Sequence, residues 1–394
     1  VLVKLSSGYN IGISRDNILD IKVVKKNEKK SEKEVEFKLS HKKPVIDLIM
    51  TGGTISSSLD VKTGGVKWLT SPGEFFKYYP DIFELADIRI INPFMKSSEN
   101  MDSEDWIRIA KQVKKSLEDE NVKGVIVTHG TDFLHYTSAV LSFFFPKPNK
   151  PIVLTYSQRS SDRGSSDADL NLYCAAKMAL SDISEVMLVG HGSSSDDFCY
   201  ALAGTKVRKM HSSRRDAFKP INSSPIAKIY KDKIEILKGD YNKRGKSSVK
   251  INSDFAFENK TALVKFYPGQ NPEILEHYLN RGYRGIIIEM SGLGHVITEG
   301  TNNWLPVLKK VIEKGITVCA SAQTIYGRLD PLVYSPGREL EKVGVIYLKD
   351  TLSETAFVKL GYVLGKTKNK EEIKKLMLEN ISKEYNERLG EEFI

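Results

Sequence analysis

Two short turns carry the residue types that nucleophilic catalysis needs. TGGT at residues 51–54 and HGTD at residues 129–132 each follow a short apolar run. A threonine hydroxyl becomes a nucleophile when a neighbouring base takes its proton, and glycines let a substrate approach the main chain closely. If both runs are parallel strands of one sheet, their carboxyl ends bring Thr54 and Thr131 to the same crevice. Taken alone, either turn is equally well explained as a connection whose glycines and threonines serve geometry only.

A base for these threonines is sought among the histidines and lysines. His129 and His191 each stand where an apolar run ends, a position more typical of a packed, structural histidine than of a catalytic one. A lysine can accept a proton when burial lowers its pKa. Lys206 and Lys209 both lie in the segment that follows the apolar run at 186–190, and spacing alone does not choose between them.

The composition favours a multidomain protein of a reducing compartment. The 394 residues have room for two or three domains. The net charge of +9 suits a protein that meets polyanions, nucleic acid first, although a lysine-rich proteome explains it equally well. The three cysteines form neither CxxC nor a Cys/His cluster with zinc spacing, so we expect free thiols and no metal.

The ends and the hydropathy of the chain add three expectations. No apolar run approaches the ~20 residues of a membrane span, and the first residues carry no signal pattern. We therefore expect a cytoplasmic protein that does not contact a membrane. Because Val1 already lies in a strand-like pattern, we also expect the numbered chain to lack its natural start.

The order of apolar runs predicts an α/β fold: a mostly parallel sheet flanked by helices in a larger domain, with a smaller α/β domain after it. The predicted units are an N-terminal β (SH3-like) module and linker at 1–42, which opens with a hairpin, a catalytic domain at 43–245, a polar connector at 246–259, and a C-terminal domain at 260–394.

The individual elements follow from the same patterns. The helix expected at 106–117 has Asp102 or Ser103 as its N-cap, and the closing stretch at 353–385 is expected to form two helices. The remaining expected elements are strands at 45–50, 88–91, 124–128, 152–155, 186–190, 262–266, 285–289 and 316–320, and helices at 134–144, 170–180, 272–281 and 302–314.

TGGTI at 51–55 and THGTD at 128–132, in this order and each after an expected strand, together resemble the asparaginase/glutaminase family of amidohydrolases. The resemblance extends from Pro44 to the last helices. It implies a threonine nucleophile supported by a threonine, an aspartate and a lysine; these four catalytic residues are Thr54, Thr131, Asp132 and Lys209.

The same resemblance implies a site for an α-amino acid. Carboxylates would hold the α-ammonium group, hydroxyl and N–H donors the α-carboxylate, and backbone N–H groups around Gly53 and Thr131 the oxyanion. No metal or organic cofactor is implied on this chain. The implied substrate-binding residues are Gly53, Ser98, Glu99 and Gly130, with Asp132 as the second carboxylate.

One departure from the family pattern concerns the activation of Thr54. Relatives carry a tyrosine in the loop after TGGTI, whereas residues 56–68 contain none. Tyr78 and Tyr79 lie far along the chain from this loop. The group that takes the Thr54 proton is therefore open at this stage.

Further motifs at 1–13, 291–296 (SGLGHV) and 335–340 (SPGREL) resemble the D-subunit family of the archaeal glutamyl-tRNA(Gln) amidotransferases. Such proteins hydrolyse the side-chain amide of glutamine or asparagine and supply ammonia to a partner, the E subunit. The partner uses ATP and magnesium to convert Glu-tRNA(Gln) to Gln-tRNA(Gln), which agrees with the absence of a GxxxxGK[ST] loop here. The resemblance implies a homodimer within a heterotetramer.

Two alternatives stay open beside this prediction. A stand-alone cytosolic L-asparaginase would hydrolyse asparagine without a stable partner. A catalytically silent scaffold or RNA-binding protein would retain the fold without turnover, and the missing tyrosine at 56–68 keeps this alternative in view.

Overall fold

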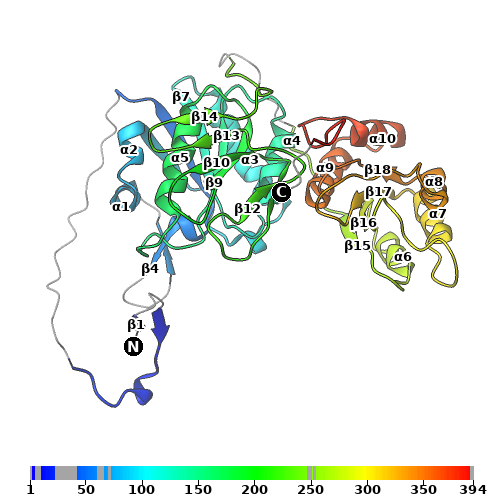
Figure 1. Ribbon diagram of the computed structural model, residues 1–394, viewed down its shortest axis with the longest axis horizontal. Helices are drawn as coiled ribbons and strands as arrows, with labels where there is room; N and C mark the ends of the chain where they lie inside the picture. Colours follow the sequence, from blue (N-terminus) through cyan, green and yellow to red (C-terminus); the bar gives the residue numbers. More distant parts are fainter. Residues whose placement is uncertain are drawn as a thin grey trace.

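The computed structural model describes residues 2–4, 10–22, 42–59, 66–69, 72–245, 251 and 254–390. A larger domain and a smaller one lie next to each other, each with a sheet covered by helices (Figure 1). The predicted α/β fold class, with a mostly parallel sheet in the larger unit, is confirmed.

The larger domain is built on an eight-stranded sheet of order β14-β13-β10-β9-β8-β7-β3-β6. Five adjacent strands are parallel: β6 (Asp87–Ile91), β3 (Val45–Met50), β7 (Val122–Thr128), β8 (Ile152–Thr155) and β9 (Val186–His191). The other three are antiparallel to their neighbours: β10 (Cys199–Ala203), β13 (Ala227–Ile229) and β14 (Ile234–Ile236).

The parallel strands are apolar because helices bury both faces of the sheet. The helix α3 begins where the sequence predicts, since the Asp102 side chain accepts hydrogen bonds from the backbone N–H groups of Glu104 and Asp105 and forms a capping box. The helices of this domain are α1 (Pro72–Tyr78), α2 (Ile82–Leu85), α3 (Ser103–Glu118), α4 (Leu134–Phe144) and α5 (Ala168–Leu180).

The smaller domain holds a four-stranded parallel sheet of order β15-β16-β17-β18. The helix expected at 302–314 begins only at Leu305, where the Asn303 side chain accepts a hydrogen bond from the Leu305 N–H. The elements are β15 (Thr261–Lys265), α6 (Glu273–Asn280), β16 (Gly285–Met290), α7 (Leu305–Glu313), β17 (Thr317–Ala322), α8 (Ser335–Lys342), β18 (Ile346–Tyr347), α9 (Ser353–Lys366) and α10 (Lys370–Leu378).

The prediction that the last helix continues to residue 385 is wrong. Helix α10 ends at Leu378, and the chain turns back toward the larger domain. Glu384 there forms an ion pair with the buried Lys359 of α9 (2.6 Å), and the Ser382 hydroxyl donates to the Ser142 carbonyl of α4. A continuing helix would carry Glu384 away from Lys359 and leave that ammonium group buried without its carboxylate, which is costly.

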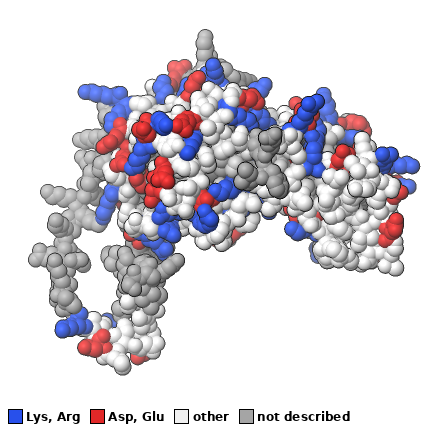
Figure 2. Space-filling model, viewed as in Figure 1, with Lys and Arg blue, Asp and Glu red and all other residues white. Residues whose placement is uncertain are grey.

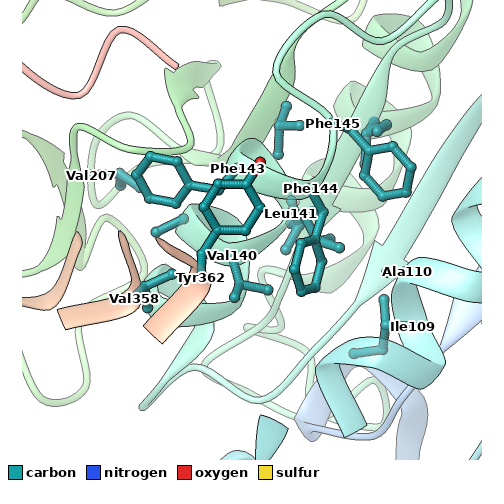
Figure 3. Close-up of a cluster of buried hydrophobic side chains, with 14 of the residues drawn as sticks. Ile109, Ala110, Val140, Leu141, Phe143, Phe144, Phe145, Val207, Val358 and Tyr362 are labelled. Carbon is teal, nitrogen blue, oxygen red and sulfur yellow. The ribbon is translucent and has the colours of Figure 1, made fainter. Parts of the chain in front are cut away.

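The two domains share one hydrophobic cluster. Figure 3 shows Phe143 and Phe144 of α4 beside Val358 and Tyr362 of α9. The Phe143 and Tyr362 rings are stacked with centroids 5.8 Å apart. Because this contact is apolar and buried, the domains have a defined relative position in the chain.

The predicted hairpin at the N-terminus is present as β1 (Leu2–Lys4), which pairs antiparallel with β2 (Asn10–Gly12). The hairpin turn, most of the linker after Lys22 and much of the expected connector at 246–259 lie outside the described residues. Three further pieces are a two-stranded sheet of β4 (Ser57–Leu59) with β5 (Val66–Trp68), a second of β11 (Val207–Lys209) with β12 (Phe218–Pro220), and a 3₁₀ turn at Arg15–Asn17.

Two whole-molecule properties complete the description. None of the helices among the described residues combines the length and apolar character needed to cross a membrane. On the face shown in Figure 2, basic and acidic side chains are interspersed, so the net positive charge does not gather there in one patch.

Candidate active site

The two Gly-Thr turns leave the large sheet side by side. Strand β3 pairs in parallel with β7, with Met50 opposite Thr128. Just beyond, both the backbone N–H and the hydroxyl of Thr51 donate to the Thr128 carbonyl, at 3.2 and 2.8 Å. The predicted shared edge is therefore present, and this edge is where open parallel sheets place their ligand sites.

The glycines of the first turn are required by backbone contact. Gly53 has φ +83° and ψ 168°, a conformation essentially restricted to glycine. A Cβ on Gly53 would lie 2.6 Å from the Gly130 nitrogen, and one on Gly52 would lie 2.2 Å from the Lys96 carbonyl oxygen. The turn that carries Thr54 thus rests directly on the main chain of the second turn.

Lys209 joins the second turn through its side chain. Its ammonium group donates to the Thr131 hydroxyl at 2.8 Å and forms an ion pair with the Asp132 carboxylate at 2.7 Å. The Lys209 side chain is 10% exposed and that of Asp132 is 62% exposed, so most of the lysine is covered while the carboxylate faces solvent. The structure brings these three predicted residues together.

Lys206, the other lysine that spacing left open, lies elsewhere. Its ammonium group forms an ion pair with Asp350 of the smaller domain at 2.6 Å, and both side chains are buried. Lys206 precedes strand β11 (Val207–Lys209), in a turn where its N–H donates to the Ala203 carbonyl, so the two lysines leave the backbone at differently oriented positions. Lys209 therefore reaches Thr131 while Lys206 reaches the smaller domain.

Thr54 begins a 3₁₀ turn (Thr54–Ser56) and is half-buried. Its carbonyl accepts a hydrogen bond from the Ser57 hydroxyl at 2.9 Å. Within the part of the chain that the structure describes, the Thr54 hydroxyl itself has no hydrogen-bond partner. The turn is thus held through its backbone, and none of the described residues engages its hydroxyl.

A tyrosine does reach this turn, although not from the following loop. Tyr79 of the segment after α1 is buried and donates its hydroxyl to the Ile55 carbonyl at 2.8 Å. Burial raises the pKa of Tyr79, so the phenol stays protonated and is a poor base. Ser161 adds a second support by donating to the Ser57 carbonyl at 2.9 Å. The sequence offers no signal for either contact, since both join distant segments.

Ser98 and Glu99 lie in a 3₁₀ turn (Ser98–Asn100) against the second Gly-Thr turn. Ser98 is buried, and a Cβ on Gly130 would come within 3.0 Å of its hydroxyl oxygen. The Phe133 N–H donates to that hydroxyl at 3.4 Å. Glu99 is exposed. Both residues also line a largely apolar cavity of about 370 Å³ between the domains, with Trp106, Phe133, Phe257 and Phe357 among its walls.

The histidines have structural positions. His129 is fully buried between the Gly130 carbonyl (2.7 Å) and the Thr137 hydroxyl (2.9 Å), and burial lowers its pKa to about 4. His191 is buried as well, between the Asn171 side-chain oxygen (2.5 Å) and the Asp196 carboxylate (2.9 Å). The interpretation of both as packed histidines agrees with these contacts.

Comparison with known proteins identifies relatives along nearly the whole chain. Residues 45–241 match the family Asparaginase, N-terminal, and residues 260–377 match the Glutaminase/Asparaginase C-terminal domain. The D subunit of the glutamyl-tRNA(Gln) amidotransferase of Pyrococcus furiosus is 47% identical over 387 residues, which cover 98% of this chain and 87% of the relative. The corresponding D subunit of Methanosarcina barkeri is 44% identical and covers 98% of this chain and 92% of the relative.

Solved structures show the same fold. The thermostable L-asparaginase from Thermococcus kodakarensis superimposes with a TM-score of 0.74 at 28% identity, over 87% of this chain and 99% of that one. L-asparaginase I from Vibrio cholerae also gives a TM-score of 0.74, at 25% identity, over 87% of this chain and 99% of that one.

Proposed function

Because the chain belongs to the asparaginase/glutaminase family, and within it to the D-subunit group of the glutamyl-tRNA(Gln) amidotransferases, we propose that it releases the ammonia used in tRNA-dependent amidation through a threonine nucleophile at Thr54. The chain is an amidohydrolase subunit. The observation that supports the nucleophile is the contact between Lys209, Thr131 and Asp132 on the turn against which Gly53 packs. The Thr54 hydroxyl that follows Gly53 has no partner among the described residues.

The proposed chemistry has two halves. The Thr54 oxygen attacks the side-chain amide carbon, its proton passes to the leaving nitrogen, and ammonia departs as the acyl-enzyme ester forms. Water then attacks the ester, releases the amino acid with a free carboxylate, and returns a proton to Thr54. The Thr131 hydroxyl takes the proton that water gives up and passes its own proton to the Thr54 oxygen as the ester bond breaks. Lys209, hydrogen-bonded to Thr131, orients that hydroxyl, and backbone N–H groups near Gly53 and Thr131 stabilise the oxyanion in both halves.

The proposed substrate contacts use the groups around Gly130. Ser98 and the N–H group of Gly130 would bind the α-carboxylate, and Glu99 with Asp132 would bind the α-ammonium group. These groups are common to glutamine and asparagine, so both fit. The proposed reaction draws on side chains and backbone of this chain alone, with no metal or organic cofactor.

The proposal extends to partners. The chain would form a homodimer that binds two copies of the E subunit in a heterotetramer. That partner would hold ATP and magnesium and amidate Glu-tRNA(Gln) with ammonia from this chain. The similarity to D-subunit proteins over nearly the full length supports this assignment.

The test compares hydrolysis of glutamine and asparagine by the chain alone and after addition of the E-subunit partner, ATP, magnesium and Glu-tRNA(Gln). We expect weak activity alone, stimulation by the full mixture, and formation of Gln-tRNA(Gln). The alternative is a stand-alone L-asparaginase, the activity named for a solved structure with the same fold. Such an enzyme would hydrolyse asparagine at a rate that the added components leave unchanged. That result would overturn the amidotransferase proposal.

A further inference from the structure

The short stretch from Thr205 to Lys209 connects the candidate active site to the smaller domain. Lys209, at its end, contacts Thr131 and Asp132. Arg208 faces the other way, as alternation along the strand requires, and Lys206 precedes the strand in a turn. Together with Thr205, they make polar contacts with the N-terminal end of α9 or with the segment before it.

Arg208, the immediate neighbour of Lys209, forms an ion pair with Glu354 at 3.0 Å. Glu354 lies in the first turn of α9, where the helix dipole favours a carboxylate. Its side chain is 8% exposed, and its second oxygen is buried without a hydrogen-bond partner among the described residues. Burial raises the pKa of Glu354 and Arg208 opposes that rise.

Two neutral groups near Arg208 come from α4, and two charged groups of the smaller domain, Glu289 of β16 and Lys265 of β15, act on Glu354 in opposite directions. His135 feels the positive charges of Arg208 and Lys209, and burial together with these charges lowers its pKa to about 3. Tyr136 is protonated, because burial raises its pKa. His135 and Tyr136 are therefore neutral, and Glu354 supplies the negative charge that holds Arg208 in place.

The preceding residues reinforce this link. Lys206 forms its buried ion pair with Asp350, and Asp350 also accepts a hydrogen bond from the Asn386 N–H at 2.8 Å. The Thr355 hydroxyl donates to the Thr205 carbonyl at 2.9 Å. Val207 belongs to the hydrophobic cluster that the domains share and appears in Figure 3 near Phe143, Val358 and Tyr362.

We propose that Arg208, held by Glu354 of the smaller domain, is a positioning residue for Lys209. Strand β11 has only the short β12 as a pairing strand among the described residues, so its register over Thr131 depends on contacts made by alternate side chains. The Arg208–Glu354 pair fixes the backbone one residue before Lys209, and a displacement of α9 moves the Lys209 ammonium group relative to the Thr131 hydroxyl. The inference rests on the proposed function and adds to it a connection between the smaller domain and the rate of amide hydrolysis.

The test removes one charge of the pair at a time in the full chain. Glu354→Gln is expected to lower kcat for glutamine about 10-fold and to leave KM within about twofold, because a misplaced catalytic group slows chemistry more than it weakens binding elsewhere. Arg208→Lys keeps the positive charge but loses the planar guanidinium group, so it is expected to lower kcat less than Arg208→Met does. The exchanged pair Arg208→Glu/Glu354→Arg is expected to recover much of the loss.

A control pair lies at the opposite end of α9. Arg284 and Glu258, whose side chains are 30% and 20% exposed, form an ion pair at 2.9 Å, and Arg284 also donates to the Leu364 carbonyl near the C-terminal end of α9. Glu258→Gln is expected to leave kcat unchanged. Two results would refute the positioning role. The first is a kcat for Glu354→Gln no lower than that of Glu258→Gln. The second is a kcat for the exchanged pair no higher than that of Arg208→Glu or Glu354→Arg alone.

A second readout is independent of turnover. The rate at which acetic anhydride acetylates Lys209, followed by mass spectrometry at several pH values, is expected to change in Glu354→Gln and in Arg208→Lys but not in Glu258→Gln. If the wild-type chain hydrolysed neither glutamine nor asparagine, the proposed function would be overturned. The labelling of Lys209 would still test whether Arg208 and Glu354 position it. Unaltered Lys209 labelling in every variant would refute the inference.

Discussion

The two Gly-Thr turns occupy the same edge of one sheet yet are stabilised in opposite ways. In the second turn the side chains are engaged: Lys209 contacts both the Thr131 hydroxyl and the Asp132 carboxylate. In the first turn the backbone is engaged, through Gly53 on Gly130 and through hydrogen bonds to the Thr54 and Ile55 carbonyls. Among the described residues, the Thr54 hydroxyl has no partner.

This difference separates two requirements of nucleophilic catalysis. A nucleophile needs a fixed position and an uncommitted oxygen, whereas a proton-accepting group needs defined hydrogen-bond partners. Backbone support meets the first requirement at Thr54, and side-chain support meets the second at Thr131. Each prediction below alters one side of this comparison.

The largest effect is expected from the nucleophile itself. Thr54→Ala should reduce kcat by about 10⁴-fold or more, because no acyl-enzyme can form, while Thr131→Ala should reduce it by about 10²-fold. Steady-state hydrolysis of glutamine and asparagine measures both. A Thr54→Ala protein that kept wild-type kcat would show that the Thr54 hydroxyl has no role in catalysis. A free energy of unfolding within about 0.5 kcal/mol of the wild-type value would show that a loss of activity is not caused by misfolding.

The two lysines should separate activity from stability. Lys209→Met should lower kcat by about 10²-fold or more with a modest change in stability. Lys206→Met should instead reduce the free energy of unfolding by about 3 kcal/mol, since it leaves Asp350 buried without its cation. Denaturant titration and initial rates on both variants measure this contrast. An equal loss of kcat in both would contradict the assignment of Lys209 alone to the site.

The contact between the turns is tested at Gly53. Gly53→Ala should cost about 2 kcal/mol of stability and lower kcat, because the backbone angles there suit glycine and the added carbon would meet the Gly130 backbone. Gly164→Ala serves as the control, since a Cβ there has nothing within 4 Å. Thermal unfolding of the two variants should differ accordingly. Similar melting temperatures would mean that the turns move apart without cost.

The smallest effect is expected at Tyr79. Tyr79→Phe removes the hydrogen bond to the Ile55 carbonyl and should cost about 1 kcal/mol, with kcat within about threefold of wild type. The opposite result would be a large loss of kcat in Tyr79→Phe at unchanged stability. It would mean that Tyr79 takes the Thr54 proton in place of the tyrosine absent from residues 56–68.

Much of this arrangement could be predicted from the chain alone. The apolar runs that end at Met50 and Thr128 are strands of one parallel sheet, because buried parallel strands are apolar on both faces. The limit of such reasoning appears at the C-terminus, where the charged pattern predicts a helix to residue 385. The helix stops at Leu378, where the buried Lys359 donates to the Met377 and Glu379 carbonyls and pairs with Glu384; these contacts join distant residues, and no local pattern reports them.

The sequence by itself determined the fold class, the two Gly-Thr turns and the residue types of the candidate site, because strand periodicity and glycine conformation are local properties of the chain. Spacing left Lys206 and Lys209 equivalent and the family resemblance selected Lys209; only the tertiary structure shows what each lysine contacts. Both are lysines of one segment, and what distinguishes them is which partner lies across from each: a threonine and an aspartate of the same domain for Lys209, a buried aspartate of the other domain for Lys206.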